Sequence, residues 1–240
     1  MAAAEVAAGD AAEGEQQQLL LLHLKLAFLA REPPACVLAL ARKAGGGSVA
    51  PHVQNFILES CTGAHVGGDQ NCTYVTTILK KIIAEAELSS DIVIDGLYEE
   101  FGQFVSSKSN NSLLNRTDMI YKEISFLSPT NDNKLVSLVA RLSCSINMLK
   151  GDTGCSLWPS SLFLSEFILS YPKIFSKKRC FELGSGVGLV GVCLNYVGSS
   201  KVILTDGDAS TLVNMKTNMK MNNLCVEQED SRLLKENNNK

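Results

Sequence analysis

Histidine is scarce in this sequence, and its cysteines never occur in closely spaced pairs. The 3 histidines lie at positions 23, 52 and 65, and the 8 cysteines are scattered without a Cys-x-x-Cys motif. Zinc sites and Cys–His catalytic pairs need these residues at short, defined spacings, so we expect neither a metal site nor such a nucleophile. Scattered cysteines also indicate reduced thiols.

A surplus of positive charge is missing as well. The net charge is −3, and the only basic cluster, SKKR at residues 176–179, is typical of a solvated turn. Proteins that hold nucleic acid through its phosphates need a basic surface, so we expect no nucleic-acid partner. The apolar run at residues 19–30 is too short to span a bilayer and contains His23 and Lys25, so we expect no membrane partner.

The first 18 residues are a low-complexity stretch of alanine, glutamate and glutamine. Such composition predicts a disordered leader at residues 1–18. The leader contains four acidic residues and no lysine or arginine, unlike a signal or transit peptide. Together with the reduced thiols, this favours a cytoplasmic protein.

Helical periodicity dominates residues 19–110. A helical pattern ends at the prolines 33 and 34, and Val75, Ile78, Leu79 and Ile82 recur at the i, i+3, i+4, i+7 spacing of one helix face. We interpret this stripe as a packing surface, and the whole segment as a helical N-terminal extension.

The pattern changes to mixed strands and helices from residue 111 onward. Residues 119–126 and 134–143 are rich in strand-forming residues and are joined by a turn-forming segment, which predicts a β-hairpin. Further on, strands at residues 180–183 and 201–206 alternate with helices at 188–197 and after Asp208, the expected cap of the second helix. Such alternation predicts an α/β fold with a parallel sheet.

The stretch FELGSGVGLVG, at residues 181–191, contains the most informative pattern. It can be read as G-x-G-x-G from Gly184 or as the dinucleotide pattern G-x-G-x-x-G from Gly186. Because the strand leads directly into Gly184, we favour the first register; the second would insert two residues between the strand and the turn. Gly191 then lies inside the helix, where we expect it to allow close packing on the sheet.

Two acidic residues flank this turn and suggest its ligand. Glu182 lies inside the preceding strand, and Asp206 ends the next strand about 20 residues after Gly184, the spacing at which a carboxylate binds ribose hydroxyls. Asp208 is an alternative ribose ligand. A cofactor with ribose, a positive sulfonium and no pyrophosphate fits an acidic glycine turn, which favours S-adenosylmethionine. A nicotinamide cofactor, and hence an NAD-dependent oxidoreductase, stays open as an alternative.

Residues 152–208 resemble the seven-stranded (class I) protein-lysine methyltransferases. That family has a Thr-Gly segment followed by Trp, then a helix, then an E-L-G-S-G-x-G-L-x-G motif, all matched here. The chain is most similar to the eukaryotic elongation factor 2 lysine methyltransferases, over about residues 71–224 and most clearly from 151. The resemblance implies a Rossmann-like sheet, S-adenosylmethionine as cofactor and elongation factor 2 as protein substrate.

The resemblance also implies roles for individual residues. Trp158 would lie beside the cofactor at the mouth of the site, although a tryptophan here could instead anchor its helix in the core. Asp206 would bind the ribose. The methionine portion would contact the glycine motif, with the acidic residue close behind. These cofactor-binding residues are Glu182, Gly184, Ser185, Gly186 and Gly188.

The sequence departs from the family after the second core strand. Only two strands of the expected seven can be placed after residue 179, so we expect residues 111–240 to form a partial, C-terminally truncated class I domain. No residue can be assigned the task of orienting and deprotonating the target lysine, and the catalytic residues therefore stay unassigned. A catalytically incompetent product that acts only as an interaction module is the alternative, and we expect the isolated chain to fold poorly because its small sheet leaves an apolar edge uncovered.

Overall fold

The computed structural model describes residues 2–62, 69–89, 92–110, 119–127, 136–145 and 153–227. The chain divides into two compact units, residues 1–125 and 126–240, which we call the helical unit and the α/β unit. The division falls at residue 125, later than the boundary at residue 110 expected from sequence. Among the described helices, none combines the length and the apolar character that crossing a bilayer requires.

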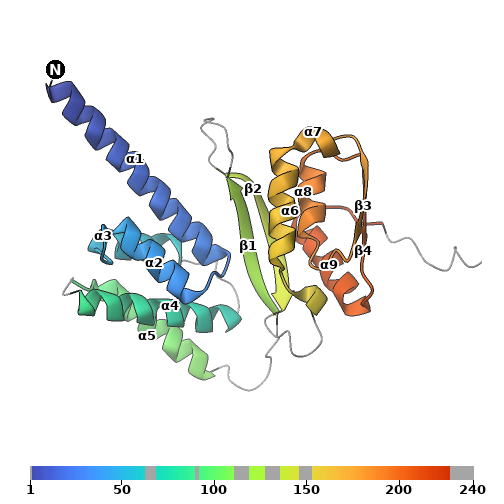
Figure 1. Ribbon diagram of the computed structural model, residues 1–240. Coiled ribbons are helices and arrows are strands. Elements are labelled where there is room, and N and C mark those ends of the chain that lie inside the picture. Colours follow the sequence, from blue (N-terminus) through green and yellow to red (C-terminus); the bar gives the residue numbers. More distant parts are fainter. Residues whose placement is uncertain are drawn as a thin grey trace, which may run out of the picture. The chain divides into compact units, whose positions relative to one another are not determined.

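Five helices form most of the helical unit (Figure 1). Both α2 and α3 begin at a proline, whose fixed φ suits the first helical position. The helices are α1 (Ala2–Leu29), α2 (Pro34–Ala44), α3 (Pro51–Ser60), α4 (Asp69–Leu88) and α5 (Asp95–Asn110).

Helix α1 includes nearly all of the segment for which low complexity predicts disorder. The structure continues the helix back to Ala2, whereas the sequence predicts a helix only from about residue 16. Alanine, glutamate and glutamine have high intrinsic helix propensity, so such a leader can extend a helix that is anchored further along the chain. That anchor is the C-terminal part of α1, where Leu24 and Phe28 are buried.

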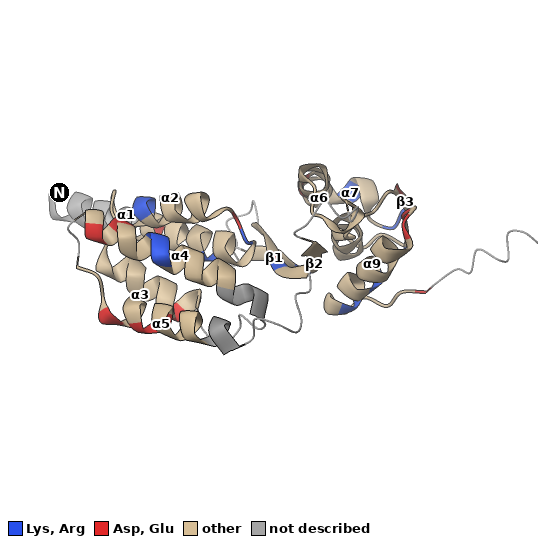
Figure 2. Cartoon of the chain, turned by 90° about the horizontal axis from the view of Figure 1, so that it is seen from below, with Lys and Arg blue, Asp and Glu red and all other residues tan. Residues whose placement is uncertain are grey.

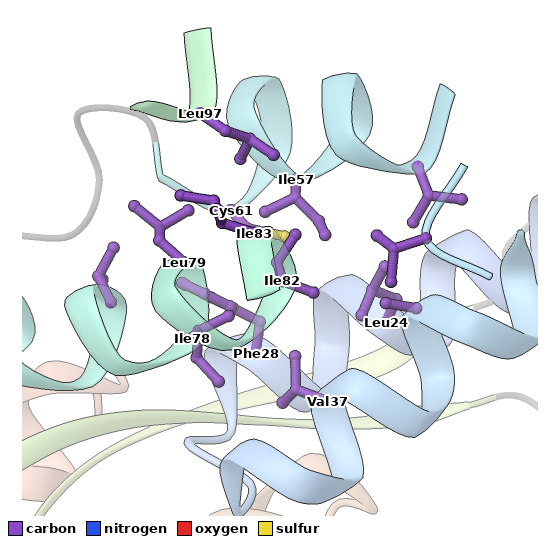
Figure 3. Close-up of a cluster of buried hydrophobic side chains, with 14 of the residues drawn as sticks. Leu24, Phe28, Val37, Ile57, Cys61, Ile78, Leu79, Ile82, Ile83 and Leu97 are labelled. Atoms are coloured by element: carbon purple, nitrogen blue, oxygen red, sulfur yellow. The ribbon is translucent and has the colours of Figure 1, made fainter. Parts of the chain in front are cut away.

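The core of the helical unit is a single cluster of apolar side chains (Figure 3). Side chains from α1 to α5 converge there, with Phe28, Ile57 and Leu97 among the fully buried ones. The predicted stripe on α4 is confirmed, because residues 75, 78, 79 and 82 are each at most 1% exposed.

One buried polar side chain joins two loops across this core. Gln54 on α3 is 0% exposed; its Nε2 donates to the carbonyls of Val49 (2.7 Å) and Ile92 (2.9 Å), and its Oε1 accepts from the amide of Ile94 (3.0 Å). Gln54 thereby satisfies backbone groups that precede α3 and α5 and that secondary structure leaves unpaired.

The first two strands form one of two small sheets. Strands β1 (Met119–Leu127) and β2 (Val136–Ser145) pair, which confirms the predicted pairing. The expected turn between them, at residues 128–135, lies outside the described residues. The remaining elements are η2 (Thr153–Cys155), α6 (Pro159–Ser170), α7 (Pro172–Phe175), β3 (Arg179–Leu183), α8 (Leu189–Tyr196), β4 (Lys201–Thr205) and α9 (Ala209–Met221).

Strands β3 and β4 form the second sheet and pair in parallel, with Phe181 opposite Ile203 and Glu182 opposite Leu204. The predicted strand–helix–strand order is thus confirmed. The fold is mixed α/β, and each sheet in the described residues has two strands, so the seven-stranded sheet of the family, of which the sequence predicts only the first two core strands here, is not confirmed.

The two faces of the β3–β4 sheet differ in how they are covered. Helix α8 lies against one face, where a Cβ at Gly191 would be only 2.6 Å from a methyl carbon of Leu204. This contact confirms the predicted packing role of Gly191. On the opposite face Phe181 is 62% exposed and Leu183 is 79% exposed, so apolar side chains of the sheet meet solvent there.

Candidate functional site

The glycine turn between β3 and α8 requires an unusual backbone. Gly184, Gly186 and Gly188 have φ values of +67°, +53° and +83°, a region that glycine enters readily and other residues rarely do. The three positions are those of the G-x-G-x-G register. Gly191 has no positive φ and faces Leu204 instead. Two different physical reasons for glycine therefore occur within one motif.

Ser185 fixes the turn to the neighbouring strand. Its amide donates to the carbonyl of Thr205 (2.8 Å), and its Oγ accepts from the amide of Thr205 (3.1 Å) and donates to the carbonyl of Glu182 (3.3 Å). The Ser185 side chain is buried at 7% exposure. These bonds extend the pairing of β3 and β4 by one residue into the turn.

Asp206 fixes the turn from the end of β4. Its Oδ2 accepts from the amide of Gly186 (3.0 Å), and its Oδ1 accepts from the amide of Asp208 (3.2 Å). The carboxyl ends of adjacent parallel strands meet at one edge of a sheet, which explains why two segments distant in sequence come together.

Asp208 caps α9, as the sequence predicts. Its Oδ2 accepts from the amide of Thr211 (2.8 Å), from the hydroxyl of Thr211 (3.0 Å) and from the hydroxyl of Ser210. The bond from Ser210, followed by those from Thr211, holds the pKa of the Asp208 carboxyl below its usual range. The carboxylate form is thereby favoured at the start of the helix.

A cavity of about 290 Å³ opens beside the glycine turn. Four of the predicted site residues line it, namely Trp158, Gly184, Gly186 and Asp206, whereas Glu182, Ser185 and Gly188 are not among the lining residues. The remaining lining residues are Thr153, Gly154, Asp208 and Thr211. Sequence reasoning assigned no site role to Thr153, Gly154 or Thr211, although a Thr-Gly pair ahead of Trp was part of the family pattern.

Trp158 lies at the surface and not in the core. Its side chain is 47% exposed, and its Nε1 donates to the carbonyl of Thr153 (2.9 Å). The exposure argues against the alternative of a core anchor. The hydrogen bond orients the indole ring while leaving much of it accessible.

The η2 turn, which contributes Thr153 and Gly154 to the cavity, touches both the glycine turn and α9. A Cβ at Gly186 would lie 3.1 Å from the carbonyl oxygen of Gly154. A Cβ at Gly154 would collide with the side chain of Thr211. Close approach of three backbone segments therefore shapes this cavity, and glycine is what permits it.

Glu182 and Gly188 lie at the two ends of the glycine turn and do not line the cavity. Burial raises the pKa of the Glu182 carboxyl to about 7, and the Ser185 hydroxyl only partly opposes the rise. Its Oε2 is buried and accepts no hydrogen bond within the described part of the chain. Gly188 packs against α9, since a Cβ there would lie 2.6 Å from the terminal methyl of Met219 and 3.0 Å from Cγ of Met215.

The arrangement suits a positively charged nucleoside ligand. Gly184 has no heavy atom within 4 Å of an added Cβ, so its backbone is open to a ligand. Each oxygen of Asp206 accepts one amide and retains a second lone pair for a hydroxyl group. The carboxylates of Asp206 and Asp208 give the cavity negative charge, and the buried Oε2 of Glu182 adds an acceptor without a partner nearby. No group of three or more metal-ligating side chains is found in the described ranges.

Comparison with known proteins finds similarity that includes the α/β unit. The family model described as lysine methyltransferase matches residues 139–236. An uncharacterised Dictyostelium discoideum protein is 29% identical over 164 residues, which cover 64% of this chain and 43% of that protein. The mouse protein-lysine N-methyltransferase EEF2KMT is 24% identical over 155 residues, 64% of this chain and 42% of the relative. Protein-lysine N-methyltransferase EFM3 of Chaetomium thermophilum is 34% identical over 83 residues, 34% of this chain and 25% of the relative.

The similarity covers only part of each relative. This chain spans less than half the length of each of these three proteins. Within the segment shared with the family model lie η2, the glycine turn and the end of β4, so the cavity is built entirely from the matched part of the chain.

Proposed function

We propose that the chain is an S-adenosylmethionine-dependent protein-lysine N-methyltransferase acting in the cytoplasm, on the premise that residues 139–236 match the lysine methyltransferase family model. The observation that carries the proposal is the position of Asp206. Its carboxylate lines the same cavity as Gly184, Gly186 and Trp158 and is bonded to the glycine turn.

The residues around the cavity have distinct roles in this proposal. Gly184 and Gly186 approach the methionine portion through their backbone, and Ser185 keeps that backbone in place through Thr205. Asp206 accepts the ribose hydroxyls. Gly188 contributes by letting the turn pack on α9.

The two remaining predicted residues act at opposite ends of the cavity. Trp158 covers its mouth with a ring held by Thr153. Glu182 supplies negative charge behind the turn when its carboxyl, whose pKa is raised to about 7 by burial, is ionised. A negative site attracts a sulfonium cation because opposite charges interact strongly where water is scarce.

The bound cofactor would supply an electrophilic methyl group to a lysine amine. The protein's part in such a displacement is mainly orientation, which can contribute several orders of magnitude to the rate. The exposed ring of Trp158 and the cavity mouth mark the side from which a lysine could enter. We assign no residue of this chain the task of accepting the lysine proton.

We further propose elongation factor 2 as the protein substrate. Support comes from the relative named EEF2KMT, which aligns with 64% of this chain. The test is transfer of labelled methyl from S-adenosylmethionine to purified elongation factor 2, with the same factor carrying Lys→Arg substitutions as control. Labelling of the factor that disappears with one such substitution supports the proposal. Binding of the cofactor without any labelling would reject this substrate.

Cofactor binding can be measured on the same chain without a substrate. Trp158 is the only tryptophan of the sequence and lies in the cavity, so titration with S-adenosylmethionine should change its fluorescence. We expect a saturable change with micromolar affinity, reproduced by calorimetry. A folded chain that binds no S-adenosylmethionine would support the interaction-module alternative, and binding of NAD instead would support an oxidoreductase.

A further inference from the structure

Helix α9 presents a row of asparagines to the edge of β2. Asn214 and Asn218 lie four residues apart on one face of the helix, and Asn222, the residue that directly follows α9, continues the same spacing. The only charged residues of α9 are Lys216 and Lys220, the blue positions on this helix in Figure 2. The face that meets β2 is thus polar but uncharged.

Two of these amides pair with the strand as a neighbouring strand would. Oδ1 of Asn218 accepts from the amide of Ser143 (2.7 Å) while its Nδ2 donates to the carbonyl of the same residue (3.1 Å). Asn222 does likewise with Arg141, at 2.9 Å and 2.7 Å. Asn214 adds one bond from Nδ2 to the carbonyl of Ser143 (2.9 Å). Side chains thereby satisfy backbone groups of β2 at residues 141 and 143.

Asn218 and Asn222 each make a second donor bond, to different partners. Nδ2 of Asn222 donates to the carbonyl of Asn218 (2.8 Å), within α9 and its C-terminal end. Nδ2 of Asn218 donates instead to the carbonyl of Val187 (2.9 Å), the residue between Gly186 and Gly188. Asn218 is 0% exposed. A carboxamide has two N–H donors, and both are used here, one on β2 and one on the glycine turn. No water is available at a fully buried position to replace a lost partner.

We propose that Asn218 is a positioning residue that sets the spacing between the two walls of the cofactor cavity. Strand β2 contacts the η2 turn, which forms one wall, and Val187 belongs to the glycine turn, which forms the other. A single amide bonded to both therefore holds the glycine turn in register with β2. The functional consequence rests on the proposed function, whereas the mechanical role does not.

Matched variants of the full chain separate this role from a general contribution to folding. Asn218→Asp and Asn222→Asp both exchange an NH₂ group for an oxygen while keeping the shape of the side chain. Each variant loses two donor bonds of Nδ2, one of them to β2, but only in Asn218→Asp is the second one the bond to the glycine turn; in Asn222→Asp it is a bond to the carbonyl of Asn218. Two quantities are measured: hydrogen exchange of the peptide covering residues 183–190, and affinity for S-adenosylmethionine.

We expect Asn218→Asp to speed exchange of the glycine-turn amides and to weaken cofactor binding by at least about tenfold, because two buried donor bonds are lost and an oxygen faces the carbonyls of Ser143 and Val187. Asn222→Asp should leave both quantities within about twofold of the wild type. Equal effects of the two variants on exchange, or no effect of Asn218→Asp, would overturn the proposal.

Two further outcomes are also decisive. If the wild-type chain binds no S-adenosylmethionine, the proposed function fails, but faster exchange at residues 183–190 in Asn218→Asp alone would still establish the positioning role. If Asn218→Asp does not fold, Asn218→Ser replaces it, since a hydroxyl is too short to bond β2 and the turn together and brings no charge. Unchanged turn exchange in a folded Asn218→Ser would overturn the proposal.

Discussion

The amide of Gly186 donates to Oδ2 of Asp206 across 3.0 Å, so the carboxylate that ends β4 also holds the backbone of the glycine turn. The other oxygen accepts the amide of Asp208 at 3.2 Å. Asp206 therefore acts on the site twice: as a group that lines the cavity and as a clamp on the backbone that forms it.

Replacing Asp206 by asparagine should weaken cofactor binding with little loss of fold. The amides of Gly186 and Asp208 bond different oxygens of Asp206, so in asparagine the NH₂ group, which only donates, would face one of them, and the negative charge is lost. We expect S-adenosylmethionine affinity to fall by at least about tenfold in calorimetry. Asp95→Asn, in the first turn of α5, removes the same charge from the helical unit and serves as control. Equal affinities of the two variants would contradict the assigned role.

The raised pKa of Glu182 predicts a pH-dependent gain of stability in Glu182→Gln. Burial raises this pKa from 4.5 to about 7, so between these values the folded chain binds a proton that the unfolded chain has lost. The contribution of the Glu182 carboxyl to the free energy of unfolding of the wild type is therefore fully present below pH 4.5 and is lost as the pH rises through 7. Glutamine does not titrate, so the melting temperature of Glu182→Gln should increase relative to wild type as the pH rises from 4.5 to 8.

Melting temperatures of the wild type and of Glu182→Gln, measured between pH 4.5 and 8, test whether the Glu182 carboxyl alone causes this trend. Glu166→Gln, at an exposed position of α6, removes a carboxylate from the surface of the same unit. A pH trend equally large in Glu166→Gln, or a constant difference between Glu182→Gln and wild type, would show that burial of Glu182 is not the cause.

Local signals predicted the segment around the glycine turn. The glycines at 184, 186 and 188 and the cap at 208 follow from rules that act within a few residues: the glycines have positive φ, and Asp208 caps α9. In contrast, the contact between Gly154 and Thr211 joins segments more than fifty residues apart. Nothing near either residue indicates such an approach.

Asn218 illustrates the same limit. In sequence it is one of several asparagines near the end of α9, and nothing local distinguishes it from Asn222. Its complete burial and its bond to Val187 arise only when β2 and the glycine turn meet α9. The prediction of disorder for the N-terminal leader was wrong because it relied on low complexity alone. Alanine, glutamate and glutamine also have strong helix propensity, and with α1 anchored further along the chain the leader is helical.

Gly191→Ala should destabilise the α/β unit by about 1–3 kcal/mol, because its Cβ would lie 2.6 Å and 3.0 Å from the two methyl carbons of Leu204. Gly207→Ala is the control, since no heavy atom lies within 4 Å of its added Cβ and its φ is not positive. Urea unfolding followed by Trp158 fluorescence reports on this unit, which contains the only tryptophan.

The double variant Gly191→Ala/Leu204→Val tests whether this single contact is responsible. Valine is shorter than leucine and leaves space for the new methyl group, so the double variant should lose less stability than the sum of the two single variants. Such coupling is expected for residues in direct contact. Strictly additive losses would mean that Leu204 is not what opposes a side chain at 191.

Gln54→Leu should loosen the loops before α3 and α5 in the helical unit. Leucine fills a similar volume but leaves the carbonyls of Val49 and Ile92 and the amide of Ile94 without their buried partner. Because unsatisfied buried groups are costly, we expect a loss of about 3 kcal/mol of opening free energy, measured by hydrogen exchange of residues 49–61 and 92–97. Gln18→Leu, at an exposed position of α1, should change exchange of the same peptides by less than about 0.5 kcal/mol. If both variants leave these peptides equally protected, the three bonds of Gln54 contribute nothing to holding the loops together.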